Sequence, residues 1–243
     1  MKKILVTISL VLLLFACTKN TYNTELLPTP TATISGKVLL YDSTGNALTN
    51  LKGAAVSLDS TNYSATTDST GMYVIKNIPA GLYTFTFSKV GYYTHKVFNV
   101  NVLGAKTTEP EPTQSLFMPS NVVANVSQIT LFYANDVPMF NVGVSIVTQS
   151  ATYINDNVVV FVSASSSVSS SNYTTSFVIS NVQGQGNLVG SLFNPSLYFS
   201  IGSTLYFTAY ATSAKTFYTD PTTGKTVYEG LGPASGIFTT TAP

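Results

Sequence analysis

The sequence is poor in charge and in the residue types that most often perform chemistry. Charged residues make up 9% of the 243 residues, all eleven basic residues are lysines, and there is one histidine and one cysteine. Because the formal net charge is +1 and arginine is absent, we expect no basic surface for nucleic acid or anionic lipid. A single cysteine forms no internal disulfide, so stability must come from packing.

Motifs for catalysis are also missing. The lone histidine, His95, cannot build a zinc site of the usual His-containing kind, and any Ser–His–Asp arrangement would have to use it. His95 alternates with Tyr93 and Val97, so we expect it to have a structural role on one face of a strand. The sequence predicts no cofactor, no metal site and no enzymatic activity. A glycosidase, which needs only two carboxylates, is the enzymatic alternative, and the candidates for it are Asp59, Asp136, Asp156 and Glu229.

The first seventeen residues have the layout of a secretory leader. Lys2 and Lys3 precede an apolar run over residues 4–15, which is too short to cross a bilayer. The following junction, Leu-Phe-Ala-Cys ending at Cys17, resembles a bacterial lipobox. That resemblance implies cleavage before Cys17 and acylation of its thiol by a fatty acid such as palmitate. We therefore expect a signal peptide over 1–16, a tether over 17–31, and an outer-membrane lipoprotein of the cell envelope whose membrane side stays undecided.

From residue 32 the pattern is that of short strands. In Leu82–Ser88, for example, Tyr83, Phe85 and Phe87 alternate with hydroxyl residues, which is typical of a half-buried antiparallel strand. Asp42–Gly45 and Asp68–Gly71 are turn sequences. No long segment shows the 3.6-residue periodicity of a helix. The clearest later strands are expected at 129–133, 142–147, 158–163, 175–179, 204–211, 226–229 and 236–240.

This spacing predicts an all-β protein with two tandem β-sandwich domains, over 32–119 and 120–243. The first domain resembles the carboxypeptidase regulatory-like domain of exported Bacteroidetes proteins, which implies a seven-stranded, transthyretin-like sandwich. The residues that carry the resemblance are Gly36–Val38, Gly53–Leu58, Thr66–Tyr73, Ile78–Tyr83 and Gly91–Tyr92.

The end of the chain resembles a fibronectin type III or immunoglobulin-like sandwich. The matching segments are 205–212 and 236–240, which the resemblance makes the last two strands. It also implies a tyrosine corner, in which the phenol of Tyr206 or Tyr210 bonds back to the main chain.

Two groups of residues are candidate sites. Phe217, Tyr218 and Tyr228 cluster around a predicted hairpin at 220–224, where exposed aromatic rings would stack on a sugar or anchor a protein partner. Alternatively, they fill the core or cover a sheet edge. Asp-Ser-Thr occurs three times and resembles the O-glycan acceptor of exported Bacteroidetes proteins, whereas ordinary turn chemistry is the alternative. The implied attachment points are Ser43, Ser60 and Ser69, or the threonine that follows each of them.

These observations favour a non-enzymatic, lipid-anchored envelope protein that binds a glycan or a protein partner. Its first domain would then be a spacer or a docking module. The alternative is a fimbrial or other surface-assembly subunit, because Bacteroidetes fimbrial lipoproteins also carry two transthyretin-like domains and polymerise by strand exchange.

Overall fold

The computed structural model describes residues 30–104, 113–147, 155–183, 189–214 and 216–243. These residues form sixteen strands, a short 3₁₀ turn and no α-helix, which confirms the all-β prediction. No described helix has the length and hydropathy that crossing a membrane would require. The expected signal peptide, Cys17 and nearly all of the expected tether lie outside the described residues.

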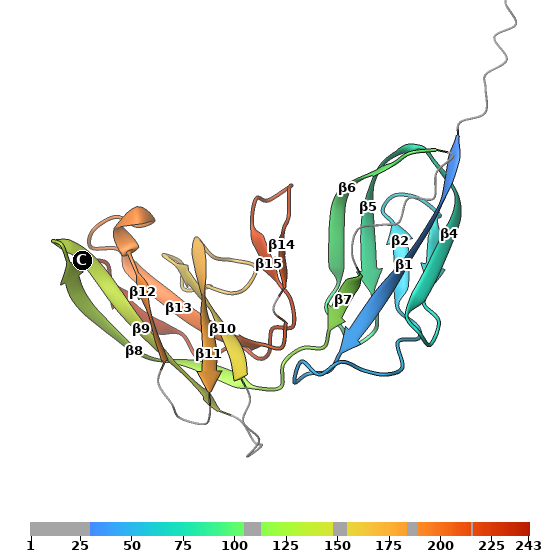
Figure 1. Ribbon diagram of the computed structural model, residues 1–243. Coiled ribbons are helices and arrows are strands. Elements are labelled where there is room, and N and C mark those ends of the chain that lie inside the picture. The colour runs from blue at the N-terminus through green and yellow to red at the C-terminus, as the bar shows by residue number, and fades with distance from the viewer. Residues whose placement is uncertain (1–29, 105–112, 148–154, 184–188, 215) are drawn as a thin grey trace, which may run out of the picture.

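The first seven strands form two facing sheets, which we call the N-terminal sandwich (Figure 1). The sheet orders are β3-β2-β5-β6 and β4-β1-β7. Neighbours are antiparallel except β1 and β7, which pair in parallel. The core between the sheets includes Phe85 and Phe87 of β5, as the alternation in that strand predicts. The bounds are β1 (Thr31–Tyr41), β2 (Ala55–Leu58), β3 (Ser64–Thr66), β4 (Met72–Pro79), β5 (Gly81–Ser88), β6 (His95–Val102) and β7 (Gln114–Phe117).

A second pair of sheets, which we call the C-terminal sandwich, has the orders β12-β9-β8 and β11-β10-β13-β16. Val142, Val144 and Ile146 of one sheet and Leu205 and Phe207 of the other are buried in its core. Strand β12 was not predicted from the sequence, because it is short and carries a glycine. The bounds are β8 (Val123–Ala134), β9 (Val137–Val147), β10 (Asn155–Ser163), β11 (Thr175–Gln183), β12 (Val189–Phe193), η2 (Pro195–Leu197), β13 (Thr204–Thr212) and β16 (Phe238–Thr241).

Strand β10 is buried on both faces, as its unbroken apolar run over residues 158–162 requires. Val158, Val160 and Val162 face the sandwich core. Val159 and Phe161 face outward into a second apolar cluster with Val168 and Leu231. Half-buried tyrosines surround this outer cluster, and one of them comes from the N-terminal sandwich: Tyr93, Tyr173, Tyr206, Tyr210 and Tyr228.

A two-stranded hairpin, β14 (Phe217–Thr219) and β15 (Thr226–Tyr228), is inserted between β13 and β16. It stands between the two sandwiches, beside β6 (Figure 1). The Asp220 carboxylate closes its turn by accepting hydrogen bonds from Thr222 N, at 2.8 Å, and Thr222 Oγ1, at 2.6 Å. The hairpin predicted around residues 220–224 is therefore present.

The tyrosine corner expected at Tyr206 or Tyr210 is not found within the part of the chain that the structure describes. Within the described residues neither hydroxyl has a hydrogen-bond partner, because both rings pack on the outer apolar cluster. A bond of that kind occurs instead in the N-terminal sandwich, where Tyr83 Oη donates to the Pro79 carbonyl at 2.9 Å. Strands β13 and β16 do pair antiparallel, with Thr204 opposite Thr241.

Candidate binding site at the inserted hairpin

The inserted hairpin presents different side chains on its two faces, because successive residues of a strand point to opposite sides. Phe217 and Tyr228 are directly opposite each other across the hairpin, with ring centroids 5.9 Å apart. Phe217 is 61% exposed, which is unusual for a phenylalanine. Tyr218 points the other way.

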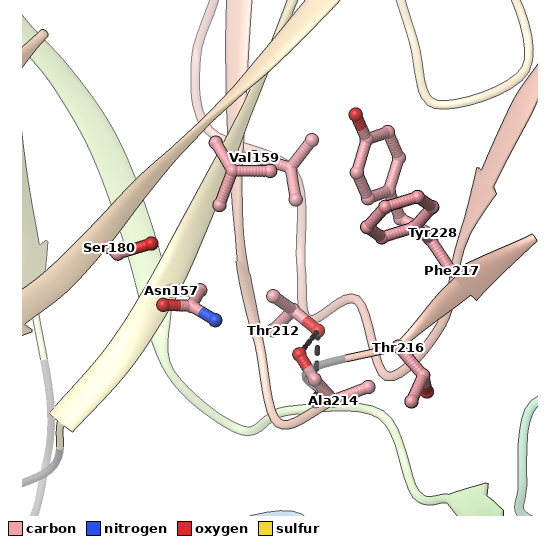
Figure 2. A pocket seen from close by; sticks show the side chains of 9 residues that line it. Asn157, Val159, Ser180, Thr212, Ala214, Thr216, Phe217 and Tyr228 are labelled. Carbon is pink, nitrogen blue, oxygen red and sulfur yellow. Dashed lines mark hydrogen bonds between the residues drawn. The ribbon is translucent and has the colours of Figure 1, made fainter.

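Phe217 and Tyr228 border a groove between the hairpin and strands β10, β11 and β13, which we call the hairpin groove (Figure 2). Its volume is about 250 Å³. In Figure 2 the two rings lie side by side on the hairpin, and Asn157 and Ser180 project from the neighbouring strands. The remaining lining residues are Val159, Val178, Thr212, Ala214 and Thr216.

The polar groups of the hairpin groove divide into occupied and free ones. Thr212 Oγ1 donates to the Glu229 carbonyl at 2.6 Å, and Thr216 Oγ1 donates to Glu229 Oε2 at 2.9 Å. The Asn157 amide and the Ser180 hydroxyl have no hydrogen-bond partner among the described residues. An apolar platform with a few unoccupied polar groups is the usual composition of a small-molecule binding site.

Tyr218 lies on the opposite face of the hairpin, against β6 of the N-terminal sandwich. Its ring contacts His95 edge-on with centroids 5.7 Å apart, and Phe98 at 5.9 Å. Burial, with smaller contributions from the charges of Glu229 and Asp220, raises the pKa of the Tyr218 phenol. The structure thus brings Phe217 and Tyr228 together at a groove and places Tyr218 where the two sandwiches meet.

The contact between the sandwiches contains a pair, a half-buried histidine and a buried glutamate, that the sequence does not predict. His95 Nδ1 lies 2.7 Å from Glu229 Oε1, and Glu229 is 2% exposed. The two residues are 134 positions apart, so no local pattern could have linked them. Their pairing is consistent with the structural role predicted for His95.

The other carboxylate candidates are dispersed. Asp59 pairs with Lys96 at 2.8 Å on the N-terminal sandwich. Asp136 lies in the turn between β8 and β9, with a positive φ of 63°. The side chain of Asp156 lies outside the described set. Among the described side chains, no carboxylate lines the hairpin groove, and no three potential metal ligands are grouped together.

The three Asp-Ser-Thr segments lie at turns, and two of them share one geometry. Asp42 and Asp68 each accept hydrogen bonds from the backbone N and the hydroxyl of the threonine two positions later. Asp59 instead binds Lys96 and the Thr86 hydroxyl. Ser60 and Ser69 are exposed, and Ser43 is half-buried.

Comparison with solved structures gives loose superpositions. A cohesin–X-dockerin complex chain from Acetivibrio cellulolyticus is 29% identical over 36% of this chain, with a TM-score of 0.31, and this chain covers 58% of its length. A DUF3823 family protein from Bacteroides ovatus is 12% identical, with a TM-score of 0.33 and coverage of 88% of this chain and 100% of the other. Another from Parabacteroides merdae is 16% identical, with a TM-score of 0.28 and coverage of 75% and 91%. Superpositions this loose carry no argument about function.

Comparison with curated proteins gives no match. Residues 33–113 match the family model of the carboxypeptidase regulatory-like domain. The matched segment runs from β1 to the residue before β7. The match confirms the resemblance that the sequence indicated for this part of the chain.

Proposed function

We propose that this protein is a non-enzymatic binding protein of the cell envelope and that it holds a glycan in the hairpin groove. One observation carries the proposal: Phe217 is 61% exposed and rests against Tyr228 at a groove whose Asn157 amide and Ser180 hydroxyl have no hydrogen-bond partner among the described residues. A sugar ring offers an apolar face of C–H groups and a rim of hydroxyls. Aromatic rings suit the first and amide or hydroxyl groups suit the second.

The electrostatics of the hairpin groove also favour binding over hydrolysis. A glycosidase needs two carboxylates that flank the scissile bond, whereas none of the described side chains that line this groove is a carboxylate. The nearest acid in the hairpin, Glu229, is buried against His95 and Thr216. The described part of the groove therefore supplies contact area and hydrogen-bonding groups, which support binding.

A glycan array with the purified protein, followed by titration calorimetry, tests the proposal. Phe217→Ala should weaken binding of the best sugar about tenfold or more, because it removes the exposed half of the aromatic platform. Tyr133→Ala is the matched control, since Tyr133 is 65% exposed at the far end of β8. The proposal would be overturned if the sugar bound Phe217→Ala as tightly as it binds the unchanged protein, or if no sugar on the array bound. Binding of a protein instead of a sugar would favour a protein partner.

The cell-envelope location is part of the proposal and rests on the leader sequence. Cys17 would carry the lipid, and residues 17–31 would link it to β1. Fractionation of cells that express Cys17→Ser tests this: the variant should leave the detergent-extracted membrane fraction. Retention of the variant in that fraction would contradict lipid anchoring.

A surface-assembly subunit is the second candidate, and strand β7 is the observation that favours it. This four-residue edge strand buries Leu116 and Phe117 beside β1, so its removal would open a sheet edge and an apolar slot to a donor strand. Cleavage near residues 104–115 followed by size-exclusion chromatography should then yield a ladder of oligomers. A stable monomer after cleavage would exclude this route.

A further inference from the structure

A second groove lies beside the hairpin, where Tyr93 of the N-terminal sandwich meets the C-terminal sandwich, and we call it the inter-sandwich groove. Its volume is about 310 Å³. It shares Tyr228 with the hairpin groove, so the two grooves flank the same ring. Its other principal lining residues are Tyr93, Tyr173, Lys225, Thr226 and Leu231.

The aromatic walls of the inter-sandwich groove are fixed by hydrogen bonds. Tyr93, which precedes β6, donates its hydroxyl to the Leu231 carbonyl at 3.1 Å, and so spans the two sandwiches. Tyr173 donates to the Thr226 carbonyl of the hairpin at 2.8 Å. Because these phenols are held by the main chain, the rings offer a preformed surface whose ordering costs a ligand little.

The charge that the described residues bring to the inter-sandwich groove has one sign. Among them Lys225 is the only charged residue that lines the groove, and its ammonium nitrogen sits 4.9 Å from the centre of the Tyr173 ring. The ammonium donates to the Ser171 carbonyl at 3.2 Å. It has no carboxylate partner among the described residues, whose ion pairs are His95–Glu229 and Lys96–Asp59.

The acids closest to Lys225 in sequence are engaged elsewhere. The Asp220 carboxylate is bound by the backbone and hydroxyl of Thr222. Glu229 is buried against His95. An ammonium group without a carboxylate partner among the described residues, held among tyrosines and hydroxyls, is suited to an anionic group on a sugar.

We propose that the inter-sandwich groove binds the acidic group, a carboxylate or a sulfate ester, of a glycan whose neighbouring ring packs in the hairpin groove. This inference rests on the proposed function and narrows it to acidic glycans. It also changes the role of the N-terminal sandwich, because Tyr93 supplies one wall of the site. That sandwich is then part of the binding module as well as a spacer.

The test compares neutral oligosaccharides with their uronate-bearing and sulfate-bearing counterparts by array and calorimetry, at low and high salt. The acidic counterparts should bind about tenfold tighter, since hydrogen bonds to charged groups are the stronger ones. Salt should reduce this preference. If the uronate-bearing sugars show this preference, the anionic group is a carboxylate, and if the sulfate-bearing sugars show it, the group is a sulfate ester.

Three lysine variants test whether Lys225 causes the preference for acidic sugars. Lys225→Met should abolish it and leave the affinity for neutral sugars, whereas Lys225→Arg should retain it. Lys76→Met, at an exposed position on β4, should change nothing. Circular dichroism melts of each variant establish that it is folded.

Failure of this inference can be separated from failure of the proposed function. Equal binding of neutral and acidic sugars, still lost in Phe217→Ala, would overturn the acidic subsite alone. An acid preference that survives Lys225→Met would also overturn it. Absence of any sugar binding, or equal binding of an acidic peptide, would overturn both.

Discussion

The imidazole of His95 and the carboxylate of Glu229 join the two sandwiches through a contact of 2.7 Å between Nδ1 and Oε1. The carboxylate also accepts a hydrogen bond from Thr216 Oγ1 at 2.9 Å. Glu229 directly follows β15, and His95 begins β6. The base of the hairpin is thereby attached to the neighbouring sandwich.

Breaking this pair should destabilise the protein strongly. Glu229→Ala leaves the partners of a buried carboxylate unpaired, so we expect the free energy of unfolding to fall by about 3 kcal/mol. Asp59→Ala is the matched control, because the Asp59–Lys96 pair is 35% and 34% exposed, and exposed pairs contribute less than about 1 kcal/mol. Urea denaturation measures both. Equal losses of unfolding free energy in the two variants would contradict the prediction that the buried Glu229 contributes more stability than the exposed Asp59.

Acid should destabilise the protein through its turn aspartates. Hydrogen bonds from the Thr70 hydroxyl, Thr70 N and Met72 N lower the pKa of Asp68 below its ordinary 3.8. A depressed pKa in the folded state contributes stability above pH 3.8 that disappears as the pH falls through the folded-state value. In Asp68→Asn the unfolding free energy should therefore decline less steeply between about pH 4 and 2. Urea midpoints at each pH measure this, and an unchanged slope would argue against the coupling.

Tyr73 carries a hydroxyl that the core does not use. Its oxygen is buried without a hydrogen-bond partner among the described residues, and burial raises the pKa of the phenol. The ring lies over Gly36 on β1, where a β-carbon would come within 2.7 Å of the Tyr73 hydroxyl oxygen. Tyr73→Phe removes an unpaired polar group at no loss of packing, so we expect stability to be unchanged or to rise by about 1 kcal/mol. A fall of more than about 1 kcal/mol in the free energy of unfolding, measured by thermal unfolding, would show that the hydroxyl has a hydrogen-bond partner.

Much of the fold follows from local patterns, and the site follows from them only in part. Alternation in β5 and the turn at Asp68 are local features, so the sequence predicts them. Strand β12 is not predicted, because its five residues include a glycine and carry too little pattern. The burial of Phe161 on the outer face of β10 depends on packing by Tyr228 and Tyr93. Both residues are distant from Phe161 in the sequence, so no local pattern predicts this burial.

The same distinction applies to the three candidate aromatic residues. Their hairpin was predicted from the Asp220 turn and the flanking residues. The division into Phe217 and Tyr228 at the groove and Tyr218 at the interface depends on where β6 lies. Likewise, no spacing rule places His95 beside Glu229, because the pair exists only once the two sandwiches meet.

Glycosylation remains a prediction that the structure sharpens. Ser60 and Ser69 are exposed, whereas Ser43 is half-buried and the hydroxyls of Thr44 and Thr70 are engaged by aspartates. Modification should therefore favour Ser60 and Ser69. Intact mass of protein from the native host should exceed the mass of the cleaved, acylated chain without glycans, and Ser60→Ala with Ser69→Ala should remove the excess. An unmodified mass would dismiss glycosylation.

Gly230 provides a last test of how tightly the hairpin base is packed. Its φ is +64°, and its carbonyl accepts hydrogen bonds from Ser120 N at 2.9 Å and Ser213 N at 3.2 Å. A β-carbon here would lie 2.5 Å from Ser213 Oγ and 2.9 Å from Ala214 N. Gly230→Ala therefore adds a clash to the cost of a left-handed alanine, and should lower the unfolding free energy by about 3 kcal/mol.

Gly224 in the hairpin turn is the matched control for that substitution. Its φ is +66°, and a β-carbon there would meet nothing within 4 Å. Gly224→Ala should therefore cost only the backbone strain, about 1 kcal/mol. The difference between the two variants in urea denaturation isolates the close approach of Ser213 and Ala214. Equal losses of unfolding free energy in the two variants would mean that the segment after Glu229 moves easily to accommodate the new β-carbon. A hairpin with such a flexible base could not hold Phe217 and Tyr228 at a fixed groove.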